Sequence, residues 1–289
     1  MTVSEAQVWT IAAVLKWATE DFRSRGIENP RLDAEVLLSR ALGASRTQLV
    51  IDMMKPLAPG ELARFRDMVK RRRAREPVAY ILGEREFYGR TFAVDSRVLI
   101  PRPDTETLVE VALARTRAVS LCARVLDLCT GSGCVAITLA RERPTTSVTG
   151  SDASADAVAV AEKNALRLGA YNARFVVADV YGKLQNTYDL ITANPPYIAA
   201  PEIAGLSADI VQFEPHLALE GGADGYAVTT RIVDGAPAHL AKGGVLAMEV
   251  GAGQAEHVAE LLRARGFASI ERARDYARIE RVVSGVWVS

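Results

Sequence analysis

The sequence predicts an α/β protein in which a small helical domain and a β-hairpin precede a mostly parallel, seven-stranded sheet. Three observations predict it. Apolar residues recur at helical spacing in residues 1–82, aromatic and β-branched residues gather with glycines in residues 83–103, and strand-like runs alternate with helical segments in residues 104–289. Strands separated by helices are typical of a parallel sheet with helices on both faces. We therefore expect a helical domain at 1–82, a hairpin linker at 83–103 and an α/β domain at 104–289.

The helical domain is predicted from three segments. The first has apolar residues at helical spacing, at Val8, Ile11, Val14, Leu15 and Ala18. The second covers residues 31–42 and ends at Gly43, because glycine readily adopts the left-handed conformation that closes a helix. The third covers residues 58–76 and includes the basic run "KRRRARE", which fits either a solvated helix face or a contact with an acidic protein or RNA.

The hairpin is predicted from "GEREFYGRTFAVDSRVLIPRP", with its turn at Gly89 and Arg90. Pro101 and Pro103 end any strand there, because proline cannot donate a backbone hydrogen bond. Asp104 can then cap a helix whose first turn is rich in acidic residues.

The α/β domain is predicted from regular alternation along the chain. Strands are expected at 123–129, 146–152, 173–179, 188–194, 243–251, 267–275 and 279–289. Helices are expected at 133–143, 154–169, 226–240 and 253–266. In such sheets, ligands bind beyond the carboxyl ends of the strands, where the strand order reverses. The functional residues are therefore expected at those ends.

The bulk properties exclude several classes of protein. Lysine and arginine total 35, as do aspartate and glutamate, so no net charge attracts the chain to nucleic acid or an anionic membrane. The three cysteines lack CxxC spacing and the three histidines are scattered, so we expect no metal site. The first residues lack the pattern of a signal peptide, and no apolar run is long enough to span a membrane. We expect a monomeric, cytoplasmic protein.

A cofactor site is predicted where the first strand of the α/β domain runs into "LDLCTGSGC". Gly131 and Gly133 lie between strand and helix, where a missing Cβ lets backbone approach a ligand. Asp152 follows the second strand and can accept hydrogen bonds from both hydroxyls of a ribose. Asp127 lies inside an apolar strand, which is costly unless a cationic group pairs with it, and the ammonium group of a ligand would suit it. Asp179 ends the third strand, where it can meet an adenine amino group. These residues predict a site for a cofactor that contains adenosine.

The fourth strand ends in "NPPY", residues 194–197. Pro195 and Pro196 cannot donate backbone hydrogen bonds, and Pro196 holds Pro195 extended, so the loop has a fixed shape. The side-chain oxygen of Asn194 and the carbonyl of Pro195 can each accept one hydrogen of a planar NH2 group, while Tyr197 packs against it. Two acceptors outside the amide plane favour a pyramidal nitrogen whose lone pair faces an electrophile. These four residues are the predicted catalytic and substrate-binding slot.

"DLCTGSG" followed by "NPPY" resembles the amino-methyltransferases that use S-adenosylmethionine. More narrowly, "REFYGRTFAVDSRVLIPRPDTETLVE", "NPPYI", "FEPHLALEGGADGY" and "RDYARIERVV" are similar to the peptide chain release factor N5-glutamine methyltransferases, over nearly the whole chain. The resemblance implies a Rossmann-like class I methyltransferase domain. It also implies methyl transfer to the glutamine of a Gly-Gly-Gln motif in class-I release factors, with S-adenosylhomocysteine as product.

The resemblance assigns roles to individual residues. It implies cofactor contacts by the loop residues Cys129, Thr130, Gly131, Ser132 and Gly133. It implies that Asp152 binds the ribose, that Asp179 and Val180 flank the adenine, and that Asn194 touches both methyl donor and substrate amide. Two residues depart from the family's pattern. Cys129 stands where a glycine is commonest, and Val180 stands where many relatives carry an aromatic residue.

Four alternatives stay open. "NPPY" also fits glutamine methylation of a ribosomal protein, against which "IPRPDTE" argues. It fits adenine-N6 methylation of nucleic acid, but the neutral chain shows no basic channel or target-recognition region. Gly131, Gly133 and Ala136 match the pattern of a nicotinamide-dependent oxidoreductase, which leaves "NPPY" unexplained. A catalytically silent binding protein would not need Asp127, Asp152 and Asn194 together.

Overall fold

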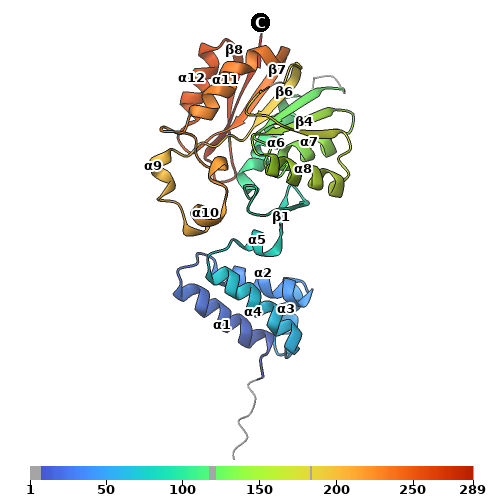
Figure 1. Ribbon diagram of the computed structural model, residues 1–289, viewed down its shortest axis with the longest axis vertical. Helices are drawn as coiled ribbons and strands as arrows, with labels where there is room; N and C mark the ends of the chain where they lie inside the picture. Colours follow the sequence, from blue (N-terminus) through green and yellow to red (C-terminus); the bar gives the residue numbers. More distant parts are fainter. Residues whose placement is uncertain (1–7, 117–121, 183, 289) are drawn as a thin grey trace, which may run out of the picture. The chain divides into compact units, whose positions relative to one another are not determined.

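The computed structural model describes residues 8–116, 122–182 and 184–288 (Figure 1). The chain forms two compact units, Met1–Gly83 and Glu84–Ser289. The boundaries expected from the sequence, 1–82, 83–103 and 104–289, stay a prediction. None of the helices in the described ranges is long and apolar enough to cross a membrane.

The first unit is helical. Its helices are α1 (Ile11–Ser24), α2 (Pro30–Leu42), α3 (Arg46–Ile51), α4 (Pro59–Arg73) and α5 (Val78–Leu82). Thr10 caps α1 by accepting a hydrogen bond from the Ala13 N–H, and Gly43 closes α2 in the left-handed conformation, as predicted. The short helices α3 and α5 were not expected. Val8 precedes α1 and is exposed, so its place in the predicted apolar stripe was wrong.

Three arginines of the basic run form ion pairs within the first unit. Arg71 pairs with Glu76, Arg72 with Asp33 and Arg73 with Asp21. The Arg72 and Asp33 side chains are both largely buried, so this pair ties α4 to α2. The arrangement favours a structural use of these arginines over a contact with RNA or an acidic protein.

The hairpin packs into the core of the second unit. Its strands are β1 (Glu84–Phe87) and β2 (Arg90–Ala93). Phe87 pairs with Arg90, so the turn is Tyr88-Gly89 and not Gly89-Arg90 as expected; both turn residues have positive φ, which suits a tight hairpin. The rings of Phe87 and Phe92 meet edge to face with centroids 6.1 Å apart, inside the same buried cluster as Leu108.

The α/β fold is confirmed, with a seven-stranded sheet in the order β5-β4-β3-β6-β7-β9-β8. The strands are β3 (Arg124–Leu128), β4 (Ser147–Asp152), β5 (Ala173–Val177), β6 (Tyr188–Ala193), β7 (Leu240–Glu249), β8 (Phe267–Arg274) and β9 (Glu280–Trp287). The first five are parallel, and β9 runs antiparallel to both of its neighbours. The strand order reverses at β3, which lies between β4 and β6.

Helices cover the sheet on both faces. They are α6 (Glu106–Arg115), α7 (Cys134–Glu142), α8 (Ala155–Leu168), α11 (Ala227–His239) and α12 (Ala255–Ala264). Alternate strand residues enter separate cores: Val125 packs in the cluster that contains residues of α6, α7 and α8, whereas Leu126 packs with α11 and α12. This alternation follows from the period of two along a strand.

Further short elements border the carboxyl ends of the strands. They are the 3₁₀ turns η1 (Pro103–Thr105) and η2 (His216–Ala218) and the helices α9 (Ala200–Ile203) and α10 (Ala208–Phe213). The sequence analysis assigned no helix or strand to the residues between 194 and 226, which separate β6 from α11. These elements are too short for a periodic apolar pattern to be recognised.

We predict that Phe92→Ala destabilises the second unit by about 3–5 kcal/mol, because it removes a fully buried ring and leaves a cavity. Tyr171→Ala is the control, since Tyr171 is 84% exposed and its loss is expected to change the free energy of unfolding by less than about 0.5 kcal/mol. Urea unfolding followed by circular dichroism measures both. Equal stabilities for the two variants would show that the hairpin does not contribute to this core.

Candidate active site

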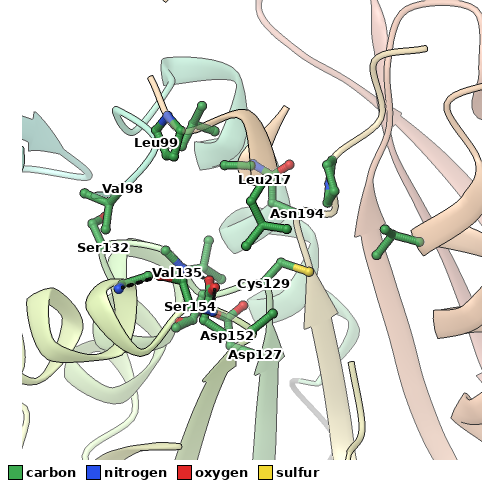
Figure 2. A pocket seen from close by; sticks show the side chains of 18 of the residues that line it. Val98, Leu99, Asp127, Cys129, Ser132, Val135, Asp152, Ser154, Asn194 and Leu217 are labelled. Atoms are coloured by element: carbon green, nitrogen blue, oxygen red, sulfur yellow. Dashed lines mark hydrogen bonds between the residues drawn. The ribbon is translucent and has the colours of Figure 1, made fainter. Parts of the chain in front are cut away.

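A cavity of about 470 Å³ lies at the carboxyl ends of the parallel strands, where the strand order reverses (Figure 2). Asp127, Asp152 and Asn194 reach it from β3, β4 and the end of β6. The segments 97–105 and 215–220 complete its wall, with Leu99 and Leu217 among the apolar contributors. The cavity lies at the edge of the sheet where the strand-end rule led us to expect the functional residues, whose roles stay a prediction.

The glycine-rich turn after β3 has two glycines with different roles. Both Gly131 and Gly133 have positive φ. A Cβ added at Gly131 would meet nothing within 4 Å, so this backbone borders open space in the cavity. A Cβ added at Gly133 would lie 2.8 Å from Ile137 Cδ1 and 3.1 Å from Ala161 Cβ. Gly131 fits the expected approach to a ligand, whereas Gly133 is required for packing against α7 and α8.

The departure at Cys129 has a conformational consequence. Its φ is 55°, a left-handed conformation that costs a residue with a Cβ about 1 kcal/mol and glycine much less. This explains why a glycine suits the position. Burial, reinforced by the charge of Asp152, raises the pKa of the Cys129 thiol, so it stays protonated.

Asp127 is buried on the floor of the cavity. Its Oδ2 accepts a hydrogen bond of 2.6 Å from the Thr130 hydroxyl, and its Oδ1 accepts one of 2.7 Å from Thr192. Burial raises the pKa of Asp127 to about 6, although the two threonines oppose that shift. Without a cationic partner, its charge is therefore only partly compensated.

Two backbone N–H groups hold the Asp152 carboxylate in place. Its Oδ2 accepts from the Gly131 N–H at 2.9 Å and its Oδ1 from the Ser154 N–H at 2.9 Å. Burial raises the pKa of Asp152, and these backbone hydrogen bonds oppose it. Each carboxylate oxygen retains a second lone pair that can accept a ligand hydroxyl. The bond to Gly131 also joins β4 to the glycine-rich turn.

Asp179 and Val180 line the cavity near its edge. Asp179 forms an ion pair of 2.8 Å with Arg231, and both side chains are more than half exposed. A ligand amino group would have to share this carboxylate with Arg231. Val180 is buried and has a φ of 52°, so its backbone turns sharply where β5 has ended.

The "NPPY" loop contributes unequally to the cavity. Asn194 and Pro196 line it, while Pro195 is buried and, like the half-buried Tyr197, is not among the described lining residues. The Asn194 Nδ2 group donates a hydrogen bond of 3.2 Å to Thr105 Oγ1. Burial, followed by the charge of Glu249, raises the pKa of Tyr197 to about 12, so its hydroxyl keeps its proton.

The sequence analysis did not identify the residues that hold this loop in shape. Gln254 bridges two segments, since its Nε2 donates to the Tyr197 carbonyl at 2.9 Å and its Oε1 accepts from the Gly251 N–H at 2.8 Å. A Cβ at Gly221 would lie 2.7 Å from the Pro196 oxygen, and one at Gly225 would lie 2.5 Å from the Tyr197 oxygen. The glycines of "LEGGADGY" were the available signal, because closely spaced glycines often mark a close backbone approach.

Two buried glutamates also contribute to the structure of the site: Glu214, which the family resemblance implies as a residue that shapes the pocket, and Glu249, which was not identified from the sequence. Glu214 accepts hydrogen bonds from Arg102 and, at 3.3 Å, from the Ile100 N–H, which links "IPRP" to "FEPH" across the cavity wall. Glu249 lies at the end of β7, where burial raises its pKa to about 7. A carboxylate that ends a central strand was the signal for Glu249.

Two parts of the chain match known protein families. Residues 13–83 match the PrmC N-terminal domain, and residues 104–217 match the methyltransferase small domain. The catalytic domain of hMettl16, solved in complex with MAT2A 3'UTR hairpin 6, superposes with a TM-score of 0.58 at 16% identity, over 77% of this chain and 84% of that one. At that identity the superposition shows the fold alone.

Two relatives cover almost the full length. The release factor glutamine methyltransferase of Geobacter sulfurreducens is 43% identical over 279 residues, which is 96% of this chain and 97% of the relative. That of Bordetella pertussis is 47% identical over 260 residues, or 89% of this chain and 94% of the relative. The chain belongs to the release factor glutamine methyltransferase family.

Proposed function

We propose that the chain transfers a methyl group from S-adenosylmethionine to the side-chain amide nitrogen of the glutamine in the Gly-Gly-Gln motif of class-I release factors. The observation that carries this proposal is the position of Asn194, which borders the same cavity as the buried carboxylates Asp127 and Asp152. The name of the relatives supports the substrate. The proposal includes action as a cytoplasmic monomer, without nucleic acid or membrane.

The cavity residues fit the methyl donor. Asp127 offers a buried carboxylate for the ammonium group, and Asp152 has free lone pairs for the ribose hydroxyls. Gly131 leaves space for the ligand beside its backbone. Cys129, Thr130 and Ser132 also line this wall, in keeping with the expected loop. When bound, the donor supplies a methyl group on a positively charged sulfur, which keeps the electron pair of the broken bond.

Asn194 would bind and orient the substrate amide. Because its Nδ2 group faces Thr105, its Oδ1 is available to accept one substrate N–H. The Pro195 carbonyl is assigned the second N–H. These acceptors turn the nitrogen lone pair out of conjugation, so that it can form the new carbon–nitrogen bond, and the nitrogen then releases one proton. Positioning and transition-state complementarity are the chain's contributions.

We predict that Asn194→Ala lowers turnover by roughly 100-fold or more, because the substrate amide loses one of its two fixed acceptors. The affinity for S-adenosylhomocysteine is expected to stay within about twofold if Asn194 acts on the amide. Incubation with methyl-labelled donor and a purified release factor, followed by peptide mass spectrometry, locates the label. Label on a ribosomal protein or on DNA instead would overturn the assigned substrate, and parallel loss of binding and turnover would assign Asn194 to the cofactor.

We predict that S-adenosylhomocysteine binds more weakly as the pH falls below about 6. Its ammonium group requires ionised Asp127, whose pKa is about 6 before binding, so each lower pH unit costs up to about tenfold in affinity. Above pH 7, the affinity is expected to level off. Calorimetry between pH 5 and 8 on wild type and Asp127→Asn tests this, since the variant should bind weakly at pH 8 and lose most of the dependence. If Asp127→Asn kept the pH profile of the wild type, the ammonium group of the ligand would have to pair with another residue.

We predict that Gly221→Ala lowers kcat about tenfold or more, because the new Cβ would lie 2.7 Å from the Pro196 oxygen and displace the loop that carries Asn194. Gly60→Ala is the matched control, since its Cβ would meet only Arg64, at 3.9 Å. Steady-state kinetics with the release factor give both values. Equal kcat for the two variants would show that the loop position tolerates this displacement.

A further inference from the structure

Two further polar groups lie beside Asn194, Thr105 at the cavity wall and Glu249 at the end of β7. The Asn194 Nδ2 group donates to Thr105 Oγ1 at 3.2 Å. Glu249 lies beside Asn194, because Ala193 pairs with Met248 between β6 and β7. The Thr105 hydroxyl and the Asn194 amide are both close enough to the Glu249 carboxyl to lower its pKa, against the larger effect of burial. Thr105 is 2% exposed and Glu249 is 2% exposed, so bulk water does not compete for their hydrogen bonds. The Glu249 Oε2 atom has no partner of ordinary hydrogen-bond geometry among the described residues.

The direction of these bonds follows from the chemistry of the carboxylate. An ionised carboxylate can only accept hydrogen bonds, so ionised Glu249 favours the orientation in which the Thr105 O–H and the Asn194 NH2 group turn toward it. The lone pairs of Thr105 Oγ1 then face Asn194, which can donate a hydrogen bond to them only from its NH2 group. The Asn194 amide is thereby held with Nδ2 inward and Oδ1 free. A protonated Glu249 could instead donate to Thr105, and Thr105 could then donate to Asn194 Oδ1.

We propose that Thr105 and Glu249 are positioning residues, which set the orientation of the Asn194 side-chain amide so that its oxygen faces the substrate. This inference rests on the proposed function of Asn194. Neither residue needs to touch the reacting atoms. Both act by making one of the two amide orientations, which differ by a 180° rotation, the more favourable.

Other charged and titratable groups surround Glu249. Arg281 from β9 favours its ionised form, whereas burial and Asp104 from η1 oppose ionisation. Tyr197 from the "NPPY" loop and Cys134 from α7 also interact electrostatically with Glu249. Burial is the main cause that raises the pKa of each to about 12, so both groups stay protonated near neutral pH. The balance raises the pKa of Glu249 to about 7.

Kinetics with saturating S-adenosylmethionine and a purified release factor test the assignment. Thr105→Val keeps the shape and removes the hydroxyl, so kcat is expected to fall about tenfold with little change in KM. Thr105→Ser restores the hydroxyl and is expected to recover most of that loss. Thr107→Val is the matched control, because Thr107 is also buried but borders neither the cavity nor Asn194 in the described contacts. Equal kcat for Thr105→Val and Thr105→Ser would overturn the role of the hydroxyl.

The pH profile tests Glu249. Wild-type kcat is expected to rise as the pH increases through about 7, because ionised Glu249 holds the productive orientation. Glu249→Gln is expected to lower kcat about tenfold and to remove this rise, since an amide can donate as well as accept. Melting temperatures of all variants separate misfolding from misorientation. A wild-type profile in Glu249→Gln would overturn the proposal.

A second readout does not depend on activity. In protein labelled with ¹⁵N-asparagine, the side-chain NH2 signal of Asn194, identified by its loss in Asn194→Ala, is expected to titrate with a midpoint near 7. The titration should be absent in Glu249→Gln. If wild type methylates no release factor but the signal titrates, the substrate assignment fails and the positioning role stands. If methylation occurs and the signal does not titrate, the positioning role fails alone.

Discussion

The arrangement of the site depends on the pairing of β3 with β4 on one side and with β6 on the other. The register sets Asp127 beside Gly150 and Thr192, which brings the Thr192 hydroxyl to the Asp127 carboxylate. A Cβ at Gly150 would lie 2.9 Å from Thr130 Oγ1 and 2.5 Å from the Phe175 ring. The absence of a side chain there leaves room for the second hydroxyl that binds Asp127. A change in this register would move every polar group on the cavity floor.

Burial of carboxylates is the second property shared across the site. Asp127, Asp152 and Glu249 have raised pKa values, and in each case burial is the main cause. A buried charge costs free energy unless it is paired, so the cavity favours a ligand that brings positive charge or hydrogen-bond donors. The same burial makes hydrogen bonds directional, because water does not offer an alternative partner.

The shape of the "NPPY" loop is determined from outside the loop. The Ile198 N–H donates to the Leu219 carbonyl, and the Gly221 N–H donates to the Ile198 carbonyl at 2.8 Å. Gln254 then holds the Tyr197 carbonyl from the segment after β7. Prolines restrict φ within the loop, but these distant contacts place its carbonyls in space. The position of the loop therefore depends on glycine and glutamine residues that lie outside it.

The sequence by itself determined the class of fold, the order of the strands and of the helices that cover the sheet, and the edge of the sheet where Asp127, Asp152 and Asn194 meet. These features depend on local periodicity and on the rule that parallel strands share one carboxyl edge. It did not reveal that Gly133 serves packing, that the hairpin turns at Tyr88-Gly89, or that Arg231 pairs with Asp179. Nor did it indicate that Thr105 and Glu249, 144 positions apart in the numbering, would lie behind Asn194. Only the tertiary structure decided these points, because each depends on contacts between segments that are distant in the chain and have no common local pattern.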